Sequence, residues 1–519
     1  MRKAPTMKLT PPRLTTAVAA AAVAAIALSG CADDASSSSS DTLTLGTIVQ
    51  LHTFQASEAN FSQESAYLSA VYDTLLQVDA DGELAPALVT EWSWDDSKTV
   101  VTLELRTDVT FSDGSPFNAD VAVANLTRFR DGTSTNASQL ADMVSAEADG
   151  DSTVVLTLEA PNPAFLTYLT QNAGLQESAE AFDNPDIQTV PVGSGPYLLD
   201  TETTVEGSTY YYDKNPDYWN PDQQHYEHLV IKLFSDSTAV LNAIKAGEVD
   251  GTPLFTTEDN VPAEAAGYTL SGQQPGWNGL TLADRDGTMS EPLGDVRVRQ
   301  AINYAFDRQA LLDAVAGGQG EVTEQMFPPS SAAYDVSLDS YYDYDPEKAK
   351  ELLADAGYPD GFTLSMPTAR AALGASLYDL VADQLADVGI AVEETEVPIG
   401  DFFTALLTPK FPAYYMQLQK DPADWQLAQF ILTPNATWNP FHSTDPTVAD
   451  YLQKIQLGNQ DEADQAAADL NRYLVEQAWF APFYAPGYRY ASSPDIEIIT
   501  MEGGGGAMPA LWNILPAGG

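Results

Sequence analysis

The sequence predicts an α/β fold, because segments with the two-residue period of strands alternate with segments that have the period of helices. The stretch TLTLGTIVQ after Asp41 alternates apolar and polar residues, as a strand does. Apolar side chains then recur at helical spacing from Tyr67 to Leu76. The two patterns keep following one another through short links, without an internal repeat. With 519 residues, of which 44% are hydrophobic, the chain is long enough for two or more domains.

The N-terminal segment has the pattern of an export signal. A basic head is followed by an uncharged run, TTAVAAAAVAAIALSG, at residues 15–30. Such a run predicts a secretory signal peptide over residues 1–30, and it is too short for a comfortable membrane span of about 20 residues. The sequence Leu28-Ser29-Gly30-Cys31 resembles the bacterial lipobox, in which the cysteine is acylated. Cys31 is therefore predicted to be a lipid anchor, because two or more acyl chains hold a protein stably on a membrane.

The residues after Cys31 predict a flexible tether over 31–40, since a serine-rich stretch cannot bury a core. Cys31 is also the only cysteine, which excludes an intramolecular disulfide or a zinc–cysteine cluster.

The net charge of −51 argues against a nucleic-acid partner, which needs lysine and arginine to neutralise phosphates. Two interpretations of this charge stay open. It indicates either a preference for cationic ligands or a salt-adapted surface, and the spread of acids along the whole chain favours the surface.

Further elements follow in chain order. Strands are predicted at residues 100–111, 152–160, 228–235, 361–367 and 390–397, and helices at 118–130, 294–315, 345–357 and 373–389. Asn118 or Asp120 lies near the start of the first of these helices. The helix at 345–357 has Asp345 as its N-cap, Pro346 in its first position and Gly357 just beyond its end.

Motifs of common enzyme classes are absent, which favours a binding protein without a cofactor. The chain contains no G-x-S-x-G, no G-x-x-x-x-G-K-[ST] and no H-E-x-x-H. Ser194 lies in VGSGP, where Pro196 would stop the helix that must follow a nucleophile. His225 and His228 flank a predicted strand start, where residues three apart point to opposite faces, so a surface or strand-edge role is preferred to a metal site.

Several segments, in order, resemble the extracellular solute-binding proteins of family 5, the receptors of dipeptide, oligopeptide and nickel ABC importers. They are VYDTLLQVDADGELAPALVTEWSWDDSKTVVTLELRTDVTFSDGSPFNADVAVANLTRF (71–129), PVGSGPYLL (191–199), KNPDYW (214–219), IKAGEVDG (244–251), LGDVRVRQAINYAFDRQALL (293–312) and YDPEKAKELLADAGYPDGF (344–362). The resemblance covers essentially all of the chain after the tether.

The resemblance implies a periplasmic-binding-protein-like fold of type II, with two α/β lobes joined by a two-crossing hinge and an extra domain inserted in lobe I. Hinge closure in such a fold buries the ligand between the lobes. The matching segments place lobe I at 41–78, 188–283 and 482–519, the insertion at 79–187, and lobe II at 284–481.

The resemblance also suggests ligand-binding residues. Peptide binders of the family hold the ligand ammonium with an aspartate that follows a strand of lobe II. Asp421 aligns best with this aspartate, and Asp424 is the alternative. The competing interpretation is that Asp421 and Pro422 only form a turn. Some dipeptide binders place an arginine near Arg370 for the ligand carboxylate. A surface role for Arg370, at a helix start, is the favoured interpretation.

Four more positions belong to segments that line the cleft in the family. Trp277 and Asn278 lie near the first hinge strand, although a strand tryptophan is as often part of a core. Phe54 lies with His52 in the loop after the first strand, and Trp425 would wall the side-chain pockets.

The predicted function is that of a lipid-anchored, monomeric receptor on the outer face of the cytoplasmic membrane, in the cell envelope or periplasm. It would capture peptides and deliver them to an ABC permease. The alternatives are the same fold with a metal chelate, an oligosaccharide or a cationic amine as cargo, a surface sensor on the same fold, and an exported enzyme.

Overall fold

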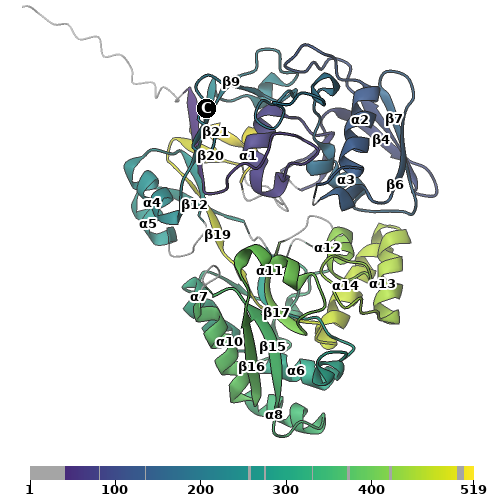
Figure 1. The fold of residues 1–519 in the computed structure, drawn as a ribbon, viewed down its shortest axis with the longest axis vertical. Helices are drawn as coiled ribbons and strands as arrows, with labels where there is room; N and C mark the ends of the chain where they lie inside the picture. The colour runs from purple at the N-terminus through teal and green to yellow at the C-terminus, as the bar shows by residue number, and fades with distance from the viewer. Residues whose placement is uncertain are drawn as a thin grey trace, which may run out of the picture. The chain divides into compact units, whose positions relative to one another are not determined.

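The computed structural model describes residues 41–80, 82–134, 136–254, 259–273, 276–329, 331–370, 375–419, 424–499 and 508–518 (Figure 1). Residues from Ser39 onward form one compact unit. No helix within the described ranges is both long and apolar enough to cross a membrane. The predicted signal peptide, the tether and Cys31 lie outside the described residues.

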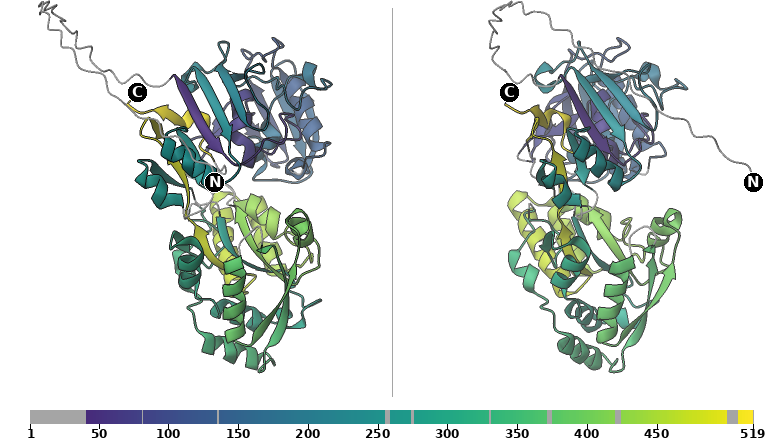
Figure 2. Two further views of the ribbon diagram at one scale, coloured as in Figure 1. Left: turned by 60° about the vertical axis from the view of Figure 1, so that its left-hand side comes forward. Right: turned by 90° about the vertical axis from the view of Figure 1, so that its left-hand side faces the viewer.

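The first lobe is built on a seven-stranded sheet in the order β12-β19-β11-β1-β10-β9-β8, seen in Figure 2. Its central strand is parallel to both neighbours, and the remaining pairs are antiparallel. The strands are β1 (Thr42–Thr47), β8 (Tyr197–Leu199), β9 (Thr209–Lys214), β10 (His228–Leu233), β11 (Gly251–Leu254), β12 (Thr269–Gln273) and β19 (Tyr488–Ser492).

Helices cover this sheet because they present apolar stripes to it. α1 (Phe61–Val71) contributes Tyr67 and Leu68 to a core shared with Leu43 and Leu45 of β1. α4 (Ser237–Ala246) and α5 (Asn260–Ala265) form a second cluster with β11 and β19. The apolar spacing predicted a helix that reaches Leu76, but α1 ends at Val71, because Tyr72 is extended (φ −121°, ψ 143°) and leads into β2 (Leu76–Val78).

The inserted subdomain has a four-stranded antiparallel sheet in the order β4-β5-β7-β6. The strands are β4 (Val89–Trp94), β5 (Val100–Leu105), β6 (Met143–Ala148) and β7 (Thr153–Leu158), preceded by β3 (Leu84–Pro86), which pairs with β2. α2 (Ala119–Arg130) buries Leu126 and Phe129 in this core, and α3 (Phe165–Tyr168) follows the last strand. Asn118 is the N-cap of α2 and accepts a hydrogen bond from the Val121 amide at 3.0 Å.

The second lobe has an antiparallel sheet in the order β14-β18-β13-β17 and a parallel pair, β15 with β16. The strands are β13 (Gly276–Leu282), β14 (Gly320–Val322), β15 (Phe362–Thr368), β16 (Ile390–Glu396), β17 (Ala413–Gln419) and β18 (Phe480–Pro486). The helices are α6 (Val296–Tyr304), α7 (Arg308–Ala316), α8 (Pro346–Asp355), α10 (Ala375–Asp387), α11 (Ile399–Leu406), α12 (Asp424–Ile431), α13 (Pro446–Leu457) and α14 (Gln460–Glu476).

The two faces of this sheet belong to different cores. Leu280 and Phe483 pack in one cluster with residues of α6, α7 and α10. Trp277 and Phe480 belong to another cluster, which includes residues of α12, α13 and α14. The sheet is therefore buried on both sides, which explains why its strands carry so few exposed side chains.

The predicted helix at 294–315 is wrong as a single element, because two helices occupy the segment. Asp307 interrupts it and serves as the N-cap of α7, where its carboxylate accepts a hydrogen bond from the Ala310 amide at 2.9 Å. Arg308 turns inward and donates to the carbonyls of Pro482 and Asn303. The cap and these buried hydrogen bonds outweigh the continuous apolar spacing on either side of the break.

The chain passes between the two main sheets twice, and β13 and β18 both belong to the second sheet. By sheet membership one crossing lies between β12 and β13 and the other between β18 and β19. The boundaries predicted from the sequence, at 283 and 482, instead place β13 and residues 482–486 of β18 in lobe I. The difference arises because both strands pack against the helices of lobe II. A short pair, β20 (Ile496–Ile498) and β21 (Ile514–Pro516), lies near the C-terminus.

Candidate ligand-binding site

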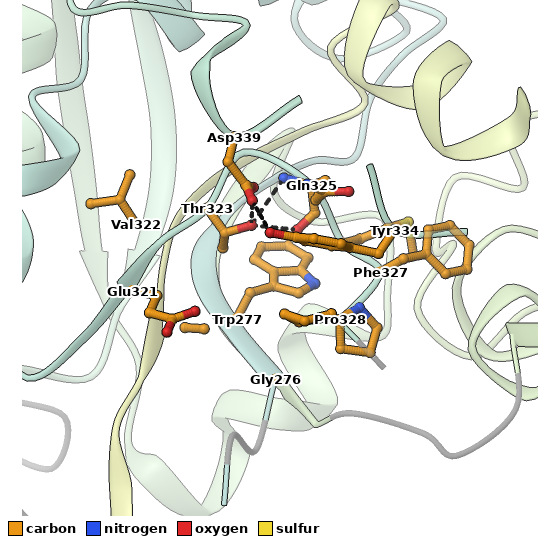
Figure 3. A pocket seen from close by; sticks show the side chains of 13 residues that line it. Gly276, Trp277, Glu321, Val322, Thr323, Gln325, Phe327, Pro328, Tyr334 and Asp339 are labelled. Carbon is orange, nitrogen blue, oxygen red and sulfur yellow. Dashed lines mark hydrogen bonds between the residues drawn. The ribbon is translucent and has the colours of Figure 1, made fainter. Parts of the chain in front are cut away.

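A pocket opens beside the first crossing, where β13 begins (Figure 3). Its cavity volume is about 30 Å³, enough for a water-sized group. The walls come from the start of β13, the edge strand β14, the chain that follows β14 and one residue of β18. The lining residues are Gly276, Trp277, Glu321, Val322, Thr323, Gln325, Met326, Phe327, Pro328, Pro329, Tyr334, Asp339 and Ala485.

Asp339 organises one wall of this pocket. Its carboxylate accepts hydrogen bonds from the hydroxyl groups of Thr323 at 2.8 Å and Tyr334 at 2.5 Å, and from the Glu324 amide at 3.3 Å. Burial raises the pKa of Tyr334, and its hydrogen bond to Asp339 and the nearby charge of Glu321 raise it further. Tyr334 is thus held as a neutral donor in a region of negative potential.

Trp277, predicted from the sequence as a ligand-binding residue, lines this pocket. Its ring is 3% exposed and packs edge-on against Phe480, with 5.6 Å between the ring centroids. Its indole Nε1 is buried and has no hydrogen-bond partner among the residues that the structure describes. A buried N–H without an acceptor costs about 1–3 kcal/mol, so an acceptor supplied by a ligand would be strongly favoured there.

α12 begins close to this wall and carries two of the predicted residues. Trp425 is buried in the core, and within the described part of the chain its Nε1 also lacks a partner. Asp424 accepts a hydrogen bond from the Ser331 hydroxyl at 2.5 Å, and burial raises the pKa of the Asp424 carboxyl. Asp424 therefore anchors the chain around Ser331. Asp421, the preferred aspartate, lies outside the described residues.

Asn278 follows Trp277 and so points to the opposite face of the sheet. It is 5% exposed, and its Oδ1 has no partner in the described ranges. Its neighbours across the strands are Gln417 of β17 and Tyr484 of β18. The structure thus separates Asn278 from the pocket that Trp277 lines, although both lie on β13.

Arg370, at the end of β15, is held by two acidic side chains. Its guanidinium forms ion pairs with Glu394 at 2.5 Å and Asp379 at 2.7 Å. These interactions raise the pKa of Arg370. A ligand carboxylate would have to compete with both acids for this cation.

Phe54 and His52 line a second pocket, in the first lobe. The Phe54 ring is 1% exposed and packs against Tyr210, so it forms the floor. The remaining lining residues are Leu51, Gln188, Thr189, Val190, Leu199, Thr201, Thr204 and Glu206. The structure does not place Phe54 in the pocket of Trp277.

The two histidines with a three-residue spacing have separate structural partners. His225 Nε2 lies 3.0 Å from the Trp512 carbonyl, and His228 Nδ1 lies 2.7 Å from Asp213. Across the described ranges no cluster of three or more histidine, cysteine or acidic residues has metal-binding geometry.

Sequence reasoning missed Glu321, Tyr334 and Asp339. Glu321 comes from an edge strand, Tyr334 from a loop and Asp339 from a short 3₁₀ helix (Val336–Ser340), and they meet Trp277 only through tertiary packing. The Pro-Pro pair at 328–329 marks a loop. It does not indicate which side chains the loop brings together.

Two α/β lobes, each with its own sheet and joined by two crossings, define the class of periplasmic binding proteins of type II. The model of the bacterial extracellular solute-binding proteins, family 5 (middle), matches residues 83–439. The chain belongs to this family, and the predicted resemblance and fold class are confirmed.

Curated relatives and solved structures are also similar to this chain, the structures in fold. The glutathione-binding protein GsiB of Escherichia coli (strain K12) is 27% identical over 352 residues, which cover 66% of this chain and 67% of the relative. The periplasmic binding protein DppA of Helicobacter pylori, solved with the peptide STSA, matches with a TM-score of 0.76 at 21% identity. That match covers 92% of this chain and 98% of the other.

NikA of Brucella suis, solved with Fe(III)-EDTA, matches with a TM-score of 0.78 at 22% identity, over 92% of this chain and 99% of the other. The same fold is therefore found with a peptide in one protein and a metal chelate in another.

Proposed function

We propose that the protein is a lipid-anchored, extracytoplasmic receptor of an ABC importer. It captures peptides between its two lobes and delivers them to a membrane permease, as a monomer and without catalysing a reaction. The observation that carries the proposal is the pocket at the first crossing, where the buried indole N–H of Trp277 lacks an acceptor. A peptide carbonyl is an acceptor of the required kind.

The relatives support a peptide cargo. GsiB is named for binding glutathione, which is itself a tripeptide, and DppA was solved with a tetrapeptide. The described lining of the pocket mixes aromatic rings with a few polar groups, as sites for small organic ligands do. A hinge with two crossings would let the lobes enclose such a ligand and exclude water.

We further propose that six side chains contact the cargo. Trp277 and Trp425 would supply indole N–H donors, and Asp421 would hold the ligand ammonium. The other three are Asn278, Arg370 and Phe54. Of these Arg370 has the weakest support, because two acids already neutralise it.

Acylation of Cys31 explains how the protein would stay near its permease. A Cys31→Ala variant should be secreted into the medium or periplasm, whereas the parent protein should remain in the membrane fraction and incorporate labelled palmitate. Equal membrane retention of both proteins would contradict the anchor.

Native mass spectrometry of the full chain, purified in detergent from its producing cells, tests the cargo. We expect a spread of co-purified peptides that denaturation and refolding remove. A single non-peptide mass would instead support a chelate, an oligosaccharide or an amine as cargo. Consumption of an added peptide would support an enzyme.

A further inference from the structure

We propose that the pocket between β13, β14 and residues 325–329 and 331–339 holds a positively charged group of the cargo, such as a lysine ammonium, and that Glu321 supplies the opposing charge. The inference rests on the proposed function, because it requires that part of the cargo enters this pocket. It adds a substrate class, peptides with a basic side chain, that family membership does not provide.

The charged side chains that are described in the lining of the pocket are all negative. Its described lining includes the carboxylates of Glu321 and Asp339 but no lysine, arginine or histidine. Glu321 is exposed at the edge strand β14, and its carboxylate makes no hydrogen bond or ion pair with any described residue. A carboxylate in a recess without a cation favours a positively charged ligand.

The two carboxylates have different roles. Asp339 is already fixed by Thr323, Tyr334 and the Glu324 amide, so it adds negative potential and holds the wall in place. Glu321 has no such partners and can turn toward an incoming cation. An ammonium donor can then form the charge-assisted hydrogen bond that Glu321 lacks.

Aromatic rings complete the chemistry of the pocket. Trp277, Phe327 and Tyr334 line the same space, and ring faces attract ammonium and guanidinium groups. The unpartnered, buried Nε1 of Trp277 is a second, independent sign of a ligand, because it requires an acceptor. A peptide that carries a basic side chain provides both the cation and a carbonyl acceptor.

The general acidity of the chain could also favour cationic peptides, but this explanation is weaker. A matched control variant distinguishes an effect of the overall charge from an effect of the Glu321 pocket. Glu147 is also exposed on an edge strand, β6 of the inserted subdomain. Glu321→Gln and Glu147→Gln remove the same charge from the protein, but only the first removes it from the pocket of Trp277.

Isothermal titration of the full chain in detergent with Ala-Lys-Ala, Ala-norleucine-Ala and Ala-Glu-Ala tests the inference. We expect the lysine peptide to bind about tenfold more tightly than the norleucine peptide, a typical effect of one charge-assisted contact. Glu321→Gln should reduce this preference to about threefold or less, and Glu147→Gln should leave it unchanged. Trp277→Phe should weaken all bound peptides alike.

The outcomes separate this inference from the proposed function. If the three peptides bind equally well, or if both glutamine variants behave alike, the cation pocket is wrong and the peptide receptor stands. If no peptide binds, the peptide function fails. Spermidine binding that Glu321→Gln weakens would then support the cation pocket alone, and its absence would overturn both.

Discussion

The hydroxyl of Ser194 donates a hydrogen bond to the Asp73 carboxylate at 2.7 Å, and this bond joins two segments that are 121 residues apart. The same carboxylate accepts from the Tyr218 hydroxyl at 3.0 Å and from Trp219 Nε1 at 3.1 Å. Three of the segments that resemble the family therefore meet at one buried acid. Asp73 is 8% exposed, and Arg106 stacks on the Trp219 ring with 4.2 Å from its Cζ to the ring centroid. The motifs at these positions thus serve the fold.

Replacement of Asp73 by alanine should lower the free energy of unfolding by about 3 kcal/mol or more, because three buried donors lose their acceptor. Urea unfolding followed by circular dichroism measures the change. Asp96→Ala, at an exposed position, is the control and should stay within about 0.5 kcal/mol of the parent. Equal stability of the two variants would contradict the role of Asp73.

Asp73 should also make stability depend on pH. Burial raises the pKa of its carboxyl from 3.8 to about 6, although hydrogen bonds from Ser194, Trp219 and Tyr218 oppose the shift. The folded state then binds more protons than the unfolded state between these values, so this contribution to stability is present below pH 4 and lost as pH rises through 6. Between pH 4 and pH 7 the loss is about 2 kcal/mol.

Comparison with Asp73→Asn isolates this effect, since other buried acids titrate in both proteins. The stability difference between parent and variant should shrink by about 2 kcal/mol from pH 4 to pH 7. A difference that is constant over this range would show that Asp73 does not titrate as expected.

Asp421 and Asp424 should have separable effects. Asp424→Asn weakens a buried hydrogen bond to Ser331, so it should cost about 1–3 kcal/mol of stability while bound peptide loses little affinity. Asp421→Asn should lower peptide affinity about tenfold or more and leave stability within about 0.5 kcal/mol, since a ligand ammonium loses its charged partner. Calorimetric titration of both variants measures the change in peptide affinity, and urea unfolding measures the change in stability. The reverse pattern would assign the ligand to Asp424.

Arg370 should have a small effect on binding, because Glu394 and Asp379 already neutralise its charge. We expect Arg370→Ala to change the affinity for free-acid and amidated forms of one peptide by similar factors, and to cost about 1 kcal/mol or less in stability. A selective loss for the free-acid form, measured by calorimetric titration, would show that Arg370 binds the ligand carboxylate.

Local patterns were sufficient for much of the fold. Asp345, Pro346 and Gly357 bracket α8 as expected: the Asp345 carboxylate accepts from the Lys348 amide at 2.9 Å, and Gly357 has a φ of +99°. Asp307 carried the same type of cap signal, but the apolar spacing around it indicated a single helix. The cap at Asp307 determines the start of a separate helix, α7. The break between α6 and α7 lets Arg308 donate hydrogen bonds to buried carbonyl groups.

The candidate site was less accessible to sequence reasoning. Trp277 was predicted because its segment resembles a cleft-lining strand, whereas Tyr334 and Asp339 follow β14 in a loop and a short 3₁₀ helix (Val336–Ser340). Nothing in their local sequence distinguishes them from surface residues. Asn278 and Trp277 are neighbours in sequence, but the strand period sends them to opposite faces.

The arrangement of the crossings has a mechanical consequence. β12 pairs with β19 in one sheet, and β13 pairs with β18 in the other, so the same two segments of the chain are hydrogen-bonded neighbours in both lobes. Two strands paired in this way bend out of their common plane at little cost, whereas splaying within that plane would break the hydrogen bonds between them. We therefore expect one soft axis of bending, so that a single distance between two dyes, one on each lobe, would follow the whole cycle of capture and release.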